Sequence, residues 1–188
     1  MSPTLTRWLQ GQRSQGCALA MLLCLSCLAF GGEPASKETQ LKAAFLYNFT
    51  KFVEWSPQSF ADAESPIVIG VLGSGALSDE LENAVLDRKI NGRAIHVKRV
   101  PGLAGARSVH LLFVGASEDA ALGEIREALK GANVLTVGES EAFARSGGVI
   151  TFVIEAGKMR FDINMTAAAQ AAVKISAQLQ KLARSVRK

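Results

Sequence analysis

Cysteine is scarce in this sequence of 188 residues. Its three cysteines, Cys17, Cys24 and Cys27, all come before Phe30. If that segment is removed on export, the remaining domain has no thiol for a disulfide, a catalytic nucleophile or a metal site. Sulfur chemistry is then excluded from whatever the remaining domain does.

Histidine is equally rare, with only His96 and His110. Both fall in predicted strands rather than in the loops where catalytic groups usually collect. The sequence contains no His-x-His, His-Glu-x-x-His or Gly-x-Ser-x-Gly pattern, and its carboxylates are scattered over predicted helix surfaces. We therefore expect no catalytic residues, no metal site and no cofactor.

A long apolar run is also missing. Residues 1–16 contain Arg7 and Arg13 but no acid, and residues 17–30 carry no charge. This order is typical of a signal peptide, and the run is shorter than the roughly 20 apolar residues of a spanning helix. We predict a signal peptide over 1–31, cleaved near Gly32 or slightly later at Ala35, and a periplasmic domain over 32–188. A membrane anchor and a lipid anchor at Cys27 are the alternatives.

Excess positive charge is small once that segment is gone. The full chain has 21 basic and 17 acidic residues, and loss of Arg7 and Arg13 leaves 19 against 17, a net charge of +2. This balance gives no reason to expect nucleic acid as a partner.

The first half of the remaining chain alternates helical and strand patterns. Apolar residues at helical spacing predict an amphipathic helix over 37–55, ended by Ser56-Pro57. The segments that follow are a buried strand over 67–73, a helix over 74–85, a tight turn at Asn91-Gly92 and a strand over 94–100.

The second half continues the alternation and then changes. Strands are predicted over 110–115 and 134–138, around a helix over 118–130. Residues 149–154 and 158–164 flank Glu155-Ala156-Gly157 and predict a hairpin with a three-residue connection, and a helix is expected over 166–188. The fold class is α/β, a three-layer sandwich with a mostly parallel sheet, a C-terminal antiparallel hairpin and helices on both faces.

One glycine-rich turn suggests a ligand site. Gly73, Ser74 and Gly75 follow a predicted strand and open a helix, where backbone amides can bind phosphate. A dinucleotide fingerprint would also need glycine at Ser78, and no P-loop lysine follows. A strand-to-helix turn that needs flexible residues explains the pattern better than a phosphate site, and small-ligand sensing near 73–78 and 115–117 is the alternative function.

Several segments together resemble the YfiR-like family of periplasmic proteins. The resemblance covers about residues 37–183, and its motifs are Lys42–Trp55 (KAAFLYNFTKFVEW), Ile69–Gly73 (IGVLG), Asn91–Arg93 (NGR), Leu112–Gly115 (LFVG), Val134–Val137 (VLTV), Gly147–Ile150 (GGVI) and Arg160–Asn164 (RFDIN).

The resemblance implies a non-enzymatic repressor that binds the periplasmic sensor region of an inner-membrane diguanylate cyclase and lowers cyclic di-GMP output, which restrains biofilm formation. A histidine kinase is the alternative membrane partner, and the resemblance also implies an outer-membrane lipoprotein partner and a homodimer. Disulfide-based redox sensing, which the resemblance would add, does not transfer, because the remaining domain has no cysteine.

Two surfaces are candidates for partner binding. On the first helix, Tyr47, Lys51 and Glu54 belong to the polar side and offer aromatic and charged contacts. Arg160 and Asp162 lie on the second hairpin strand, 158–164, which we expect to form an exposed edge able to add a partner strand.

Overall fold

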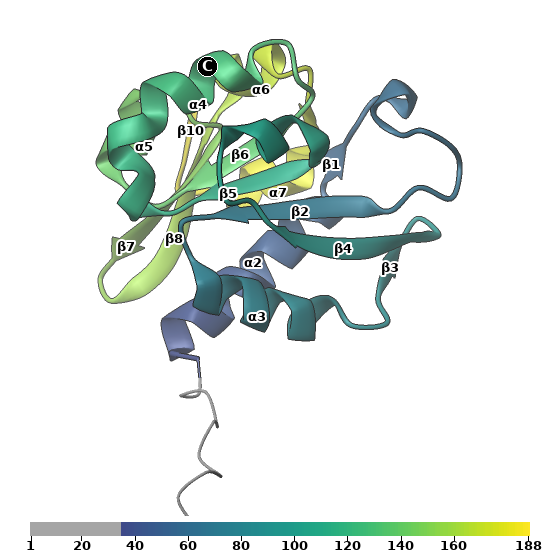
Figure 1. The fold of residues 1–188 in the computed structure, drawn as a ribbon. Coiled ribbons are helices and arrows are strands. Elements are labelled where there is room, and N and C mark those ends of the chain that lie inside the picture. Colours follow the sequence, from purple (N-terminus) through teal and green to yellow (C-terminus); the bar gives the residue numbers. More distant parts are fainter. Residues whose placement is uncertain (1–34) are drawn as a thin grey trace, which may run out of the picture. The chain divides into compact units, whose positions relative to one another are not determined.

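An eight-stranded sheet forms the centre of the protein in this computed structural model, which describes residues 35–188 (Figure 1). The predicted signal peptide and the three cysteines lie outside the described residues. The strand order is β10-β8-β7-β6-β5-β2-β4-β3. The strands are β2 (Ile67–Leu72), β3 (Lys89–Ile90), β4 (Arg93–Arg99), β5 (Leu111–Val114), β6 (Leu135–Gly138), β7 (Ile150–Glu155), β8 (Lys158–Asn164) and β10 (Ser185–Arg187).

The sheet is mostly parallel, as predicted. Strands β4, β2, β5, β6 and β7 run parallel to their neighbours, whereas β3 with β4 and β7 with β8 are antiparallel hairpins. Strands β2 and β5 are buried along nearly their whole length, which explains their continuous apolar sequences. The predicted turn at Asn91-Gly92 joins β3 to β4, and both residues have positive φ angles.

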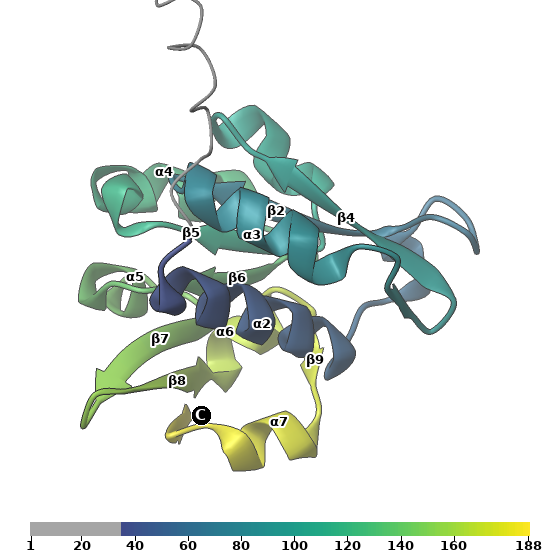
Figure 2. The ribbon, with the colours of Figure 1, turned by 90° about the horizontal axis from the view of Figure 1, so that it is seen from below.

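Helices cover both faces of the sheet and complete the three predicted layers. Helices α2 (Lys37–Lys51) and α3 (Gly75–Val85) lie side by side on one face (Figure 2). The other face carries the 3₁₀ segments η2 (Leu103–Ser108) and η3 (Ala116–Ala121), with α4 (Leu122–Leu129) and α5 (Glu141–Arg145). The 118–130 segment is therefore partly 3₁₀, and α5 was not predicted.

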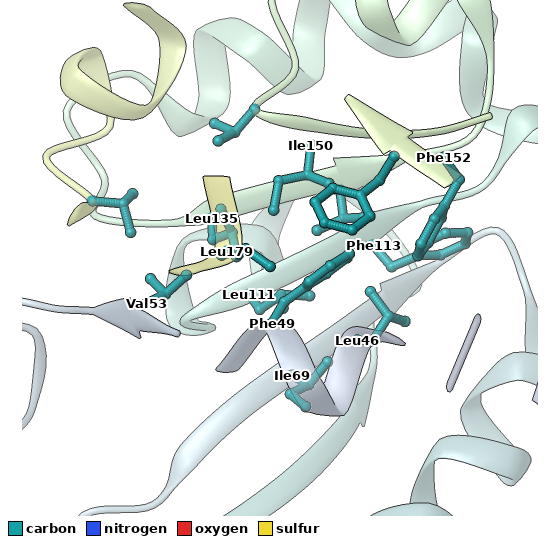
Figure 3. Packing of buried hydrophobic residues seen from close by; sticks show 14 of the residues in the cluster. Leu46, Phe49, Val53, Ile69, Leu111, Phe113, Leu135, Ile150, Phe152 and Leu179 are labelled. Atoms are coloured by element: carbon teal, nitrogen blue, oxygen red, sulfur yellow. The ribbon is translucent and has the colours of Figure 1, made fainter. Parts of the chain in front are cut away.

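Aromatic packing attaches α2 to the hairpin. The Phe49 ring lies 5.7 Å from that of Phe152 and 5.0 Å from that of Phe161, between ring centroids. Phe45 contacts the same two rings from one turn earlier. Figure 3 shows Phe49 among the buried side chains that rise from the sheet. This side of α2 is thus part of the core and unavailable to a partner.

The predicted helix over 37–55 is shorter than expected. Helix α2 ends at Lys51, and β1 (Val53–Glu54) follows and pairs antiparallel with β9 (Lys174–Ile175). Its last turn tightens, since the Thr50 hydroxyl donates to the Tyr47 carbonyl (2.6 Å) and the Phe52 N–H donates to Phe49. The freed Phe52 carbonyl then accepts a bond from the Ser176 N–H, so a tertiary pairing overrides the helical periodicity.

The single C-terminal helix predicted over 166–188 is wrong. The segment divides into α6 (Met165–Gln170), β9, α7 (Ala177–Leu182) and β10. Ala172 ends the first part in the left-handed region (φ +50°), and the Ser176 side chain caps α7 by accepting the Leu179 N–H. Leu179 and Ile175 are buried as the pattern required, but from separate elements.

The predicted hairpin is present, with two corrections. Glu155 pairs with Lys158, so the connection is the two-residue turn Ala156-Gly157 with both φ angles positive. Strand β8 is exposed as an edge only in part, because β10 pairs parallel with it from Asp162 to Asn164, while Lys158–Arg160 have no strand partner on that side among residues 35–188. The misassigned C-terminal helix hid the strand that covers this edge.

Candidate functional site

Tyr47 lies between two cations on the solvent side of α2. The Lys51 ammonium is 4.0 Å from the ring centroid, and the Arg88 guanidinium carbon is 4.8 Å from it. Lys51 follows one turn later on the same helix, whereas Arg88 comes from the segment after α3. We call Tyr47, Lys51 and Arg88 the Tyr47 patch; it offers an aromatic ring and positive charge together.

The two cations also act on the phenol. Burial raises the pKa of Tyr47, but the adjacent Arg88 and Lys51 outweigh it, so that the pKa lies below its ordinary value. The lowered pKa reflects a local positive potential. Such a patch suits an anionic or hydrogen-bond-accepting group on a partner.

Glu54 is exposed, as predicted, but it does not continue the helical stripe. It lies on β1 with its neighbour Val53 buried, and its pairing partner on β9 is Lys174. The structure therefore places Tyr47 and Lys51 together and Glu54 on a separate two-stranded ribbon.

Arg160 and Asp162 lie apart from the Tyr47 patch. Helix α2 contacts the β7–β8 hairpin through Phe45 and Phe49, whereas Tyr47 contacts Arg88 near α3, on the other side of α2 (Figure 2). Asp162 accepts two hydrogen bonds from Arg184, from Nε at 2.9 Å and from Nη2 at 2.5 Å. Arg160 remains exposed on β8. The five predicted partner-binding residues do not form one surface.

The glycine turn lies where the sheet reverses its winding. Strands β2 and β5 are neighbours, and the chain leaves β2 for α3 on one face and β5 for η3 on the other. Gly73 has a φ of +83°, and its carbonyl accepts a bond from the Ser117 hydroxyl (3.2 Å). Gly75 starts α3, and the Ser74 side chain makes no capping hydrogen bond to it.

A carboxylate of the protein binds one backbone amide near this turn. Glu139, just after β6, accepts the Ala116 N–H at 3.2 Å and forms an ion pair with Lys42 of α2 at 2.5 Å. Burial lowers the pKa of Lys42, but Glu139 and Glu38 outweigh it and raise the pKa above its ordinary value. Glu139 thus occupies one backbone amide near the turn, that of Ala116, and ligand binding at Gly73, Ser74 and Gly75 stays a prediction.

Both ring nitrogens of His110 are hydrogen-bonded to the backbone. Its Nδ1 accepts the Val68 N–H and its Nε2 donates to the Ser59 carbonyl, both at 3.0 Å, which fixes a neutral tautomer. The ring stacks on Phe60 with centroids 4.5 Å apart. Burial lowers the pKa of His110, and the positive charge of Arg93 adds to the effect, against the Ser59 bond. His110 therefore holds the loop after α2 against the sheet.

Sequence reasoning missed Arg88. It lies far from Tyr47 along the chain, and no local pattern predicts that the end of α3 reaches this ring. Among residues 35–188, no cluster of three or more histidine, cysteine or acidic side chains is placed to hold a metal ion. In the same range, no helix combines the length and the apolar composition needed to cross a membrane.

These features define the class of protein: a three-layer α/β domain with candidate partner-binding groups on the solvent side of helix α2. The family model described as YfiR/HmsC-like matches residues 39–184, and the chain belongs to this family. YfiR family proteins are periplasmic and regulate diguanylate cyclase signalling. No curated protein sequence matches the chain.

Comparison with solved structures bears on the fold alone, and the first of the two below supports it. A conserved domain protein from Vibrio cholerae O1 biovar eltor has a TM-score of 0.53 at 13% identity, and the match covers 79% of this chain and 60% of that one. The ABC domain in complex with L-Trp from Streptococcus pneumonia has a TM-score of 0.49 at 14% identity, with the same coverage. The chain thus spans about 60% of the length of these structures.

Proposed function

We propose that this protein is a periplasmic regulator that binds an inner-membrane signalling protein, a diguanylate cyclase or a related sensor, and lowers cyclic di-GMP output. The family match over residues 39–184 carries this proposal. The Tyr47 patch supports it, because an aromatic ring held between two cations on an exposed helix is typical of a protein interface.

The Tyr47 patch joins the edge of the core to exposed charge. Tyr47 is half-buried and packs against the core, whereas Lys51 and Arg88 are exposed, and the aromatic contacts that hold α2 to the hairpin use Phe45 and Phe49. Tyrosine and arginine are enriched among the residues that dominate binding energy at interfaces. The predicted Glu54, Arg160 and Asp162 are separate contact candidates within the same proposal.

The test is capture of the membrane partner together with a cellular readout. The tagged protein is used to isolate binding proteins from solubilised inner membranes, which are identified by mass spectrometry, and cyclic di-GMP is measured in cells with and without the gene. We expect recovery of a membrane cyclase or kinase with a periplasmic sensor region and higher cyclic di-GMP in the deletion strain.

A matched pair of variants locates the surface. Tyr47→Ala combined with Lys51→Glu is expected to reduce capture by about tenfold or more, because both a ring and a charge are lost. Lys181→Glu reverses an exposed charge on α7 and serves as the control. Equal capture by the two variants would remove the Tyr47 patch from the proposal, and capture of no signalling protein by the unmodified chain would overturn the function.

A further inference from the structure

Strand β4 has a free backbone edge. Its hairpin partner β3 ends the sheet and pairs only with Arg93 and Ala94. Within residues 35–188, no strand lies against β4 from Ile95 to Arg99 on that side. We call this stretch the open margin (Figure 1).

The directions of the amides along β4 follow from its known bonds. The Val100 N–H donates to the Val71 carbonyl of β2, and backbone groups alternate in direction along a strand. The N–H and C=O groups of Ile95, Val97 and Arg99 therefore point away from β2. Arg93 points the same way and pairs with β3, which agrees with this alternation. The open margin thus presents a row of donors and acceptors ready to pair with another strand.

The two faces beside the open margin differ in chemistry. On the α3 face a shallow groove is lined by Val85, Leu86, Ile95 and Val97, and Leu86 is 70% exposed. Its charges are balanced, since Glu82 and Asp87 line it with Arg88 and Lys89. Side chains alternate along a strand, so His96 and Lys98 belong to the opposite face; both are exposed, although His96 also borders the groove, and the Lys98 ammonium is bonded to the Ser108 hydroxyl.

This asymmetry specifies what can pair there. We propose that the open margin of β4 binds an extended segment of a protein partner as an added strand, with apolar side chains toward the Leu86 groove and acidic side chains beside His96 and Lys98. Backbone hydrogen bonds to β4 would set the register of the added strand. Contacts with the two faces would set its preference for alternating apolar and acidic residues.

The open margin continues the Tyr47 patch. Arg88 contacts the Tyr47 ring and also lines the groove beside Val97. The inference rests on the proposed function, because it describes how a segment of the partner would be held next to that patch. One partner can therefore contact α2 and the sheet edge together.

A synthetic peptide tests the open margin without the membrane partner. The probe is a short fluorescent peptide of alternating valine and glutamate, with an alternating valine and lysine peptide of equal length as its control, and binding is measured by anisotropy on the protein produced from its full sequence. We expect the glutamate peptide to bind at least about tenfold more tightly. Equal binding of the two peptides would overturn the acidic preference.

Proline at position 97 tests the pairing. Val97→Pro removes an outward N–H that no described residue uses, and Val97→Ala loses side-chain area but keeps the amide. Val97→Pro is expected to lose glutamate-peptide binding, and Val97→Ala is expected to keep most of it. Equal affinities would overturn strand addition.

Lys98→Glu gives a second test that leaves the backbone unchanged, since it should shift the peptide preference toward the lysine peptide. An unchanged preference would count against the proposed face.

Two further measurements separate the possible occupants. Sedimentation of the unmodified chain and of Val97→Pro shows whether the edge pairs with a second copy; self-association that the proline abolishes would overturn the proposal of a foreign partner. Membrane capture that survives Val97→Pro would leave the proposed function intact and overturn this inference. Peptide results as expected, with no signalling protein captured by the unmodified chain, would support the inference and count against the function.

Discussion

The two sides of the sheet end differently. At one side β10 covers Asp162–Asn164 of β8 and Arg184 binds Asp162 across the pair; we call this covered stretch the closed margin, and the start of β8, Lys158–Arg160, stays uncovered but carries exposed cations at both of its ends. At the other side β3 covers only the first two residues of β4 and leaves the open margin from Ile95 to Arg99 free. Both edges belong to seven-residue strands, but only the edge of β8 is paired with the C-terminal strand β10.

This difference shows where the protein tolerates exposed backbone. An uncovered edge invites pairing with other chains, and proteins usually shorten, charge or cover it. The closed margin is covered, whereas the open margin is flanked by His96 and Lys98 and by an exposed leucine. The charges oppose nonspecific pairing of like chains and leave room for an acidic one.

The largest effect is expected in the core that supports the closed margin. Phe49→Ala removes a fully buried ring that contacts Phe45, Phe152 and Phe161. We expect a loss of about 3–5 kcal/mol in the free energy of unfolding, measured by urea denaturation. Tyr47→Ala, two residues earlier and half-buried at the edge of the core, is the comparison and should cost less. Similar losses would show that the Tyr47 patch is part of the core.

A smaller effect is expected at the closed margin itself. Asp162→Asn replaces the carboxylate that accepts two bonds from Arg184 with a neutral amide that has a single oxygen. The contact with Arg184 is then weaker, and β10 should open more often. Hydrogen exchange should become faster at residues 162–164 and 185–187. Asp79→Asn, which removes the exposed ion pair between Asp79 and Arg99 near the open margin, is the matched control. Unchanged exchange in β10 would show that backbone pairing alone holds it.

The sequence predicted the sheet better than its margins. Continuous apolar strands, the Asn91-Gly92 turn and the alternation in β8 are local signals, and the structure confirms all three. The sequence does not predict strand β10, because the apolar stripe of 166–188 fits a single helix. In the structure this segment is divided by the helix cap at Ser176 and by the pairing of Val186 with Ile163. Local periodicity does not report pairing between distant segments.

The candidate site likewise has one part that follows from local sequence spacing and one part that depends on tertiary packing. Tyr47 and Lys51 are one helical turn apart, so their proximity follows from helix geometry. Arg88 and the open margin depend on how α3 and β4 pack against α2, which no residue spacing encodes. The open edge was assigned to β8 because the hairpin pattern was visible there, whereas the incomplete pairing of β4 follows from the two-residue length of β3.

A pH effect is expected where β4 begins. His110 stacks on Phe60, and the guanidinium carbon of Arg93 at the start of β4 lies 3.9 Å from the centroid of the same Phe60 ring. The pKa of His110 is lowered in the folded state, so the unfolded chain binds more protons near its ordinary value. The stabilisation is complete above about pH 6.5 and is lost as the pH falls through the lowered pKa.

Urea denaturation across this range measures that effect. The unmodified chain should lose stability on acidification, and His110→Gln should be less stable at neutral pH but should depend less on pH. Parallel curves for the two proteins would mean that carboxylates, rather than His110, cause the acid sensitivity. The effect concerns the amino end of β4, whereas the unpaired stretch from Ile95 to Arg99 carries no buried titratable group.

The smallest change in stability is expected at the exposed leucines. Leu86 beside the open margin is 70% exposed and Leu182 on α7 is 58% exposed, so neither leucine contributes much buried area. Leu86→Ser and Leu182→Ser should each change the free energy of unfolding by less than about 0.5 kcal/mol. If the open margin binds a partner strand, only Leu86→Ser should weaken binding of the valine–glutamate peptide, because its side chain lines the groove where the peptide's apolar residues would lie. Equal binding by the two variants would mean that the exposed Leu86 side chain does not contribute to peptide binding. The two margins would then differ only in their unpaired backbone groups.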